Sequence, residues 1–132
     1  MNISGTWLGT YWQKGQPTRF EATFVQGNNA LSGSILDENN LGEAQLSGEV
    51  IGRSIRFTKR YLTSSPIPID YGGSINDEEN FMSGTWQLEL PAKEGGRPRK
   101  LSGTWEAHRS DQDLMADLKN RLTQQIPVGA NS

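Results

Sequence analysis

The clearest structural signal in the chain is the stretch MSGTWQLEL at residues 82–90. Apolar or small residues occupy every second position from Met82 to Leu90, and Ser, Thr, Gln and Glu occupy the positions between them. A β-strand with one buried and one solvated face requires this period of two. We therefore predict a half-buried strand over residues 81–90.

The same alternation recurs in LSGTWEAH at residues 101–108 and in AQLSGEV at residues 44–50. Along the whole chain it predicts eight strands, near residues 3–12, 19–26, 30–37, 43–51, 54–62, 69–76, 81–90 and 100–109. The connections are too short for parallel crossovers, so neighbouring strands are expected to pair antiparallel. Closure into an up-and-down barrel leaves no open strand edge, which makes an all-β meander barrel the predicted fold. A two-sheet sandwich is the alternative.

The pattern changes after Arg109. Ser110 is a typical helix cap, and Pro127 ends the segment that follows. One helical face would carry four apolar residues: Leu114, Met115, Leu118 and Leu122. We predict a C-terminal amphipathic helix at about residues 110–125 and a frayed tail at 127–132, so that residues 1–126 form a single domain. The helix is expected to dock on its own barrel, and a contact with a second copy or a protein partner is the alternative.

The composition excludes several classes of function. The chain has 132 residues, 21% charged residues and a net charge of −2, which does not favour nucleic-acid or membrane-surface binding. It contains no Cys, so thiol chemistry and Cys-ligated metals are excluded. The sequence shows neither a signal peptide nor an apolar run of about 20 residues, and we expect a cytoplasmic protein.

Glycine recurs at the inward positions of the predicted strands. Because glycine weakens a strand, its repeated use there needs a structural reason. In a narrow barrel the reason is curvature and room for large rings such as Trp7, Trp86 and Trp105. The inward glycines are Gly5, Gly9, Gly33, Gly48, Gly73, Gly84 and Gly103.

The strand directions place the two long connections, around residues 62–68 and 91–99, at one end of the barrel. We interpret this end as an open mouth, since long loops commonly carry function. Amphipathic side chains around an apolar cavity are typical of a small-molecule site, and Lys59 could face an acidic group of the ligand. Alternatively, Lys59 extends to water at the rim of a solid barrel, which the small volume of a narrow barrel slightly favours. The inward residues near the mouth are Tyr11, Phe20, Ile35, Lys59, Tyr61, Tyr71 and Leu88.

Gly5-Thr6-Trp7 in the first strand, together with Arg109 at the end of the last, resembles the Gly-x-Trp and Arg signature of the calycins. These are the lipocalins, fatty-acid-binding proteins and avidins. The resemblance implies that Trp7 plugs the closed end of an eight-stranded barrel and that Arg109 packs over its ring. It implies no particular ligand, because the chain lacks the helix pair of fatty-acid-binding proteins and a set of biotin ligands.

No pattern in the sequence indicates catalysis, a cofactor or a metal. His108 is the only histidine and points outward in its strand. The acidic turns at residues 37–40 and 77–80 could hold a hard cation, but solvated turn polarity is the favoured interpretation. A cluster of positive charges could meet an anionic partner, although a solvated hairpin tip is the plainer interpretation. It consists of Lys93, Arg97, Arg99 and Lys100.

The sequence thus favours a calycin-like protein that binds a small, mainly apolar ligand at the barrel mouth, with Lys59 allowing the ligand to be acidic. A protein-interaction or assembly module built on a solid barrel is the alternative, and an enzyme ranks third.

Overall fold

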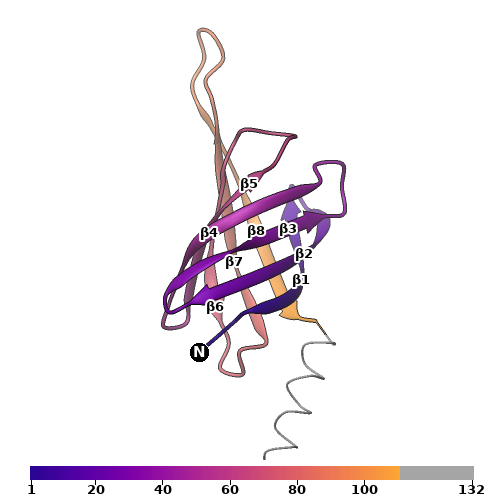
Figure 1. Cartoon of the computed structure of the whole chain (residues 1–132). Coiled ribbons are helices and arrows are strands. Elements are labelled where there is room, and N and C mark those ends of the chain that lie inside the picture. Colours follow the sequence, from indigo (N-terminus) through magenta and orange to yellow (C-terminus); the bar gives the residue numbers. More distant parts are fainter. Residues whose placement is uncertain (111–132) are drawn as a thin grey trace, which may run out of the picture.

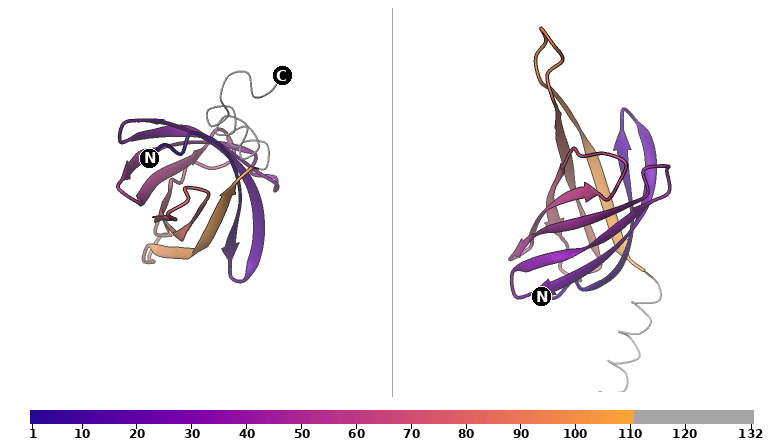
Figure 2. Two further views of the ribbon diagram at one scale, coloured as in Figure 1. Left: turned by 90° about the horizontal axis from the view of Figure 1, so that it is seen from below. Right: turned by 45° about the horizontal axis from the view of Figure 1, so that its top comes forward.

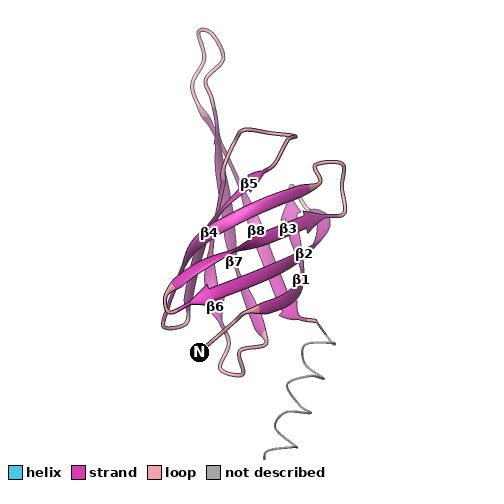
Figure 3. Cartoon of the chain, viewed as in Figure 1, coloured by secondary structure: helices cyan, strands magenta, loops and turns pink. Residues whose placement is uncertain are grey.

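The computed structural model describes residues 1–110, and every regular element in them is a β-strand (Figure 3). The strands are β1 (Gly5–Gln13), β2 (Gln16–Gly27), β3 (Ala30–Asp37), β4 (Glu43–Ile51), β5 (Ser54–Tyr61), β6 (Ile69–Ile75), β7 (Phe81–Leu90) and β8 (Arg99–Arg109). The part of the chain that the structure describes contains no helix that could cross a membrane. The predicted C-terminal helix lies outside the described residues.

The strands form a closed antiparallel barrel in which each strand pairs with its neighbour in sequence and β1 also pairs with β8. Closure places Trp7 opposite Arg109 and Tyr11 opposite Trp105. Seen from below, the strands enclose a common interior (Figure 2). The predicted eight-stranded barrel is therefore confirmed, and the sandwich alternative is wrong.

The predicted strand limits hold within a few residues, with one exception in β2. The predicted strands leave residues 13–18 as the first connection, but the turn contains only Lys14 and Gly15, with φ angles of 50° and 76°. Two successive positive φ angles match the right-handed twist of the flanking strands in a two-residue hairpin. Pro17 consequently belongs to β2, where it lies opposite Trp12.

The two ends of the barrel differ. The N-terminus and the end of β8 lie at one end, and the loops after β1, β3, β5 and β7 lie at the other (Figure 1). The β7–β8 hairpin rises well beyond the rest of that rim (Figure 1). We call the end with the loops after β1, β3, β5 and β7 the mouth, and the opposite end the base.

Arg109 holds the base together. Its guanidinium carbon lies 5.1 Å from the centre of the Trp7 ring. The same group donates hydrogen bonds to the backbone carbonyls of Asn2, Ser4 and Glu79 at 2.7, 3.1 and 2.8 Å. Arg109 thus ties the N-terminal segment and the β6–β7 turn across the bottom of the barrel, while Trp7 fills the interior above it.

A continuous series of aromatic rings fills the barrel from the base toward the mouth. Trp7 contacts Phe24 edge to face at 6.2 Å, and Phe24 contacts Phe57 at 5.8 Å. Phe57 then stacks on Tyr71 at 4.8 Å, and both rings meet Trp105 edge to face. Such offset and edge-to-face contacts suit the charge distribution of aromatic rings. The lower barrel is therefore a packed core.

The inward glycines serve two purposes. A β-carbon at Gly9 would lie 2.3 Å from the Phe20 ring, and one at Gly103 would lie 2.6 Å from the Trp86 indole nitrogen and 2.1 Å from the Trp12 backbone oxygen. These two glycines make room for rings, as the sequence predicts. A second group meets the backbone of the neighbouring strand at 1.8–2.2 Å, so close strand approach requires glycine there. This group comprises Gly33, Gly48, Gly73 and Gly84.

Candidate functional site

A cavity of about 160 Å³ opens at the mouth. Its deeper part is formed by buried aromatic side chains from four strands: Tyr11, Tyr61, Tyr71 and Trp86. Its upper wall is mainly aliphatic and consists of Leu41, Ile67, Ile69, Leu88, Leu90 and Leu101. Gln13 and Ser65 complete the lining, so none of the lining residues carries a charge.

The structure brings together four of the seven residues that the sequence predicts for a ligand site. Tyr11, Tyr61, Tyr71 and Leu88 line the mouth cavity. The other three do not, and each is buried in the barrel interior instead: Phe20, Ile35 and Lys59.

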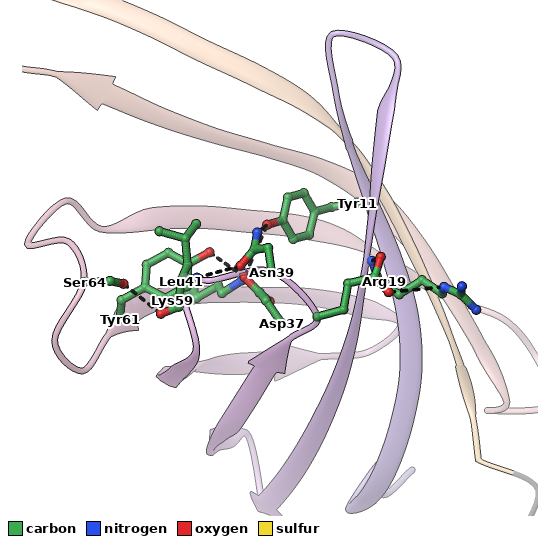
Figure 4. Close-up of polar contacts among 9 residues, drawn as sticks. Tyr11, Arg19, Asp37, Asn39, Leu41, Lys59, Tyr61 and Ser64 are labelled. Carbon is green, nitrogen blue, oxygen red and sulfur yellow. Dashed lines mark hydrogen bonds and ion pairs between the residues drawn. The ribbon is translucent and has the colours of Figure 1, made fainter.

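Lys59 is fully buried, with a side-chain exposure of 0%. Its Nζ donates to both carboxylate oxygens of Asp37, at 2.8 and 2.9 Å, and Asp37 is equally buried (Figure 4). The expectation that Lys59 reaches water at the rim is therefore wrong. A lysine in a barrel interior must find an anion, because an unpaired buried charge is costly, and Asp37 supplies it.

Tyrosine hydroxyls complete the surroundings of this ion pair. Tyr61 donates to Asp37 at 2.6 Å and Tyr11 donates to it at 3.2 Å (Figure 4). The amide of Asn39 donates to the Tyr11 hydroxyl at 3.0 Å. The Lys59 ammonium also lies 4.8–5.8 Å from the ring centres of Tyr11, Tyr61 and Tyr71, which favours its positive charge. These are the only three tyrosines in the chain.

Burial controls the ionisation of the cluster. It raises the pKa of each of the three tyrosines, and the Asp37 carboxylate raises each pKa further. Burial lowers the pKa of Lys59, and Asp37 acts in the opposite direction. The tyrosines are therefore neutral at physiological pH, and the ion pair has no net charge.

Asp37 is the functional residue that the sequence reasoning missed. The predicted strand 30–37 ends at Asp37, as β3 does, but its carboxylate was assigned to a solvated acidic turn and is only 4% exposed. The alternation of β3 contains the signal, since Leu31 and Ile35 point inward and Asp37 follows at the same period. An inward lysine on β5 requires an inward carboxylate nearby, and Asp37 at the end of β3 supplies it.

The other candidate features show no comparable arrangement. His108 is exposed on β8, and residues 1–110 contain no cluster of side chains able to hold a metal ion. The four basic residues Lys93, Arg97, Arg99 and Lys100 are all exposed on the β7–β8 hairpin. A larger hollow of about 630 Å³ lies along β4–β7, but most of its lining is polar and it opens broadly to solvent.

The comparisons with known proteins bear on the fold. The chain matches no protein-family model and no curated protein. Among solved structures it is similar to "a redesigned beta barrel, mFAP1, bound to DFHBI", with a TM-score of 0.57 and 15% sequence identity over 81% of this chain and 94% of that one. This likeness and the closed eight-stranded topology agree with a calycin-like barrel at the level of architecture.

Proposed function

We propose that the protein binds a small, mainly apolar molecule in the mouth cavity. The observation that carries the proposal is a cavity of about 160 Å³ with an aliphatic wall above buried aromatic rings. Small-molecule sites are commonly concave, mostly apolar and largely preformed. An engineered protein cavity of about 150 Å³ with an apolar lining holds a molecule the size of benzene.

The size and lining of the cavity define the ligand class. One ring with one or two small substituents fits the volume, and its transfer from water to the aliphatic wall would supply the binding energy. The absence of charge among the lining residues and the pairing of Lys59 with Asp37 favour a neutral ligand over an acidic one. An acid would lose its hydration in the cavity without gaining a counter-charge.

The architecture also supports the proposal. The base is closed by Trp7 and Arg109, and the rings above them pack against one another, so a ligand would enter through the mouth. The similar solved barrel was bound to DFHBI. A barrel of this kind can therefore hold a small molecule.

Calorimetric titration with p-xylene tests the proposal. We expect wild type to bind with a dissociation constant below about 1 mM, because burying one ring in a preformed cavity supplies more than about 4 kcal/mol. Leu101→Trp should abolish binding by filling the cavity, since Leu101 lines it. Leu36→Trp is the matched control, because Leu36 is 55% exposed outside the barrel. Equal p-xylene affinity in the two variants, or no binding to wild type, would contradict the proposal.

A further inference from the structure

Tyr71 differs from the other two tyrosines of the cavity in its hydrogen bonding. The hydroxyls of Tyr11 and Tyr61 both donate to Asp37, and that of Tyr11 also accepts from Asn39. The hydroxyl of Tyr71 forms no hydrogen bond with any residue of 1–110, although Tyr71 is only 4% exposed. It is thus the one tyrosine hydroxyl in the cluster that remains available to hydrogen-bond a ligand.

The available hydroxyl belongs to a residue that lines the mouth cavity. Within residues 1–110 no fully buried polar side-chain atom lacks a partner, so the Tyr71 hydroxyl is accessible from adjoining space. The ring lies inside the barrel, stacked on Phe57 and 5.8 Å from Lys59 Nζ. Tyr71 also borders the larger hollow along β4–β7, but that hollow is lined mainly by exposed outward residues, so the space on this inner side is the mouth cavity.

The neighbouring hydroxyls restrict what the cavity floor can recognise. Because Tyr11 and Tyr61 use their protons on Asp37, their oxygens can only accept a further hydrogen bond, whereas Tyr71 can donate one. A ligand hydroxyl does both: it accepts from Tyr71 and donates to the Tyr61 oxygen, because the Tyr11 oxygen already accepts from Asn39. A carboxylate would only accept, and an ammonium would only donate and would need an anion.

We propose that Tyr71 is the specificity-determining residue of the mouth cavity and that it selects small neutral ring compounds bearing a hydroxyl group, which hydrogen-bonds to its phenol. The proposal rests on the function proposed above and names the ligand class of the same site. An unsatisfied hydroxyl in a mostly apolar cavity is unfavourable, and a ligand hydroxyl relieves it.

The test uses two ligands of nearly the same shape, p-cresol and p-xylene, which differ by a hydroxyl in place of a methyl group. The quantity measured by calorimetry is the ratio of the p-xylene dissociation constant to that of p-cresol. We expect Tyr71→Phe to lower this ratio about fivefold, the value of about one hydrogen bond, and to change p-xylene affinity less than twofold. The phenylalanine ring preserves the stacking on Phe57.

Tyr11→Phe is the matched control. It removes a hydroxyl from the same cavity, but one that is already bonded to Asp37 and Asn39. We expect it to reduce stability and to change the ratio less than twofold. A second measurement, the carbon-13 spectrum of ring-labelled tyrosine, should show p-cresol shifting the Tyr71 resonance more than p-xylene does.

The outcomes separate the two proposals. If p-xylene binds wild type but Tyr71→Phe leaves the ratio unchanged, the role of Tyr71 is refuted and the apolar site stands. If 4-methylbenzoate binds wild type as tightly as p-cresol, the selection of neutral hydroxyl compounds is refuted. If none of these probes binds wild type, the proposed function fails as well.

Discussion

At the scale of single residues, the most consequential contact is the ion pair between Lys59 and Asp37. Both side chains have 0% exposure, in contrast to the surface pair of Arg19 and Glu38, whose side chains are 81% and 51% exposed. A buried pair contributes little over an apolar pair of equal size, but removal of one partner strands the other charge. The contribution of Asp37 on β3 to stability therefore depends on the presence of Lys59 on β5, and the reverse also holds.

This dependence predicts a strong coupling in stability. Asp37→Asn should lower the free energy of unfolding by about 3–5 kcal/mol, because it leaves the Lys59 ammonium buried without an anion. The double variant Asp37→Asn/Lys59→Met should be more stable than Asp37→Asn alone, as measured by urea denaturation. Glu38→Gln, the exposed control, should cost less than about 1 kcal/mol. Strict additivity of the two single substitutions would refute the coupling.

The three buried tyrosines predict a loss of stability at alkaline pH. Their folded-state pKa values are raised above the unfolded value of about 10, so the folded state holds more protons above that pH. Stability is then fully present below about pH 10 and falls above it, by up to about 1.4 kcal/mol per pH unit for each tyrosine. The lowered pKa of Lys59 has the opposite effect, because it makes stability rise with pH. This effect is confined to pH values below the unfolded pKa of lysine, about 10.4.

Absorbance of tyrosinate provides the check, since every tyrosine in the chain belongs to this cluster. The native protein should show no tyrosinate at a pH where the protein in urea is half ionised. Native titration of any one of the three near pH 10 would refute the burial argument for that residue.

At the scale of elements, the alternation of apolar and polar residues predicted all eight strands, because each strand has one face toward the barrel interior and one toward solvent. The pattern could not show that Pro17 lies within β2, since proline is also common in turns. It placed Asp37 both at the end of a strand and in a solvated turn, because a polar residue at a strand end looks the same as the first residue of the loop. Its burial depends on Lys59, which lies 22 residues away in sequence and on another strand.

Two adjacent glycines in β6 test the role of close strand approach. A β-carbon at Gly73 would lie 2.2 Å from the backbone oxygen of Ser83, whereas one at Gly72 would meet no atom within 4 Å. Gly73→Ala should therefore lower the free energy of unfolding by about 1–3 kcal/mol, since β6 and β7 must separate. Gly72→Ala should be neutral or slightly stabilising. Similar urea midpoints for the two variants would contradict this account.

At the scale of the whole molecule, strand direction and alternation together placed three tyrosines and Leu88 at the mouth. They misplaced Phe20, Ile35 and Lys59, which do not line the cavity. The depth of a residue in a barrel depends on the tilt and stagger of its strand, which a sequence pattern does not specify. The cavity itself depends on how individual side chains pack, so its volume and its neutral lining became visible only in the structure.

The measurement that tests the central claim most directly is an isotope-filtered NMR experiment that locates p-cresol on the labelled protein. We predict intermolecular contacts from the p-cresol methyl group to Ile67, Leu88 and Leu101, which line the mouth cavity. Contacts confined to Val25 and Leu36, which are more than half exposed, would instead place the ligand on the outer surface and contradict the account.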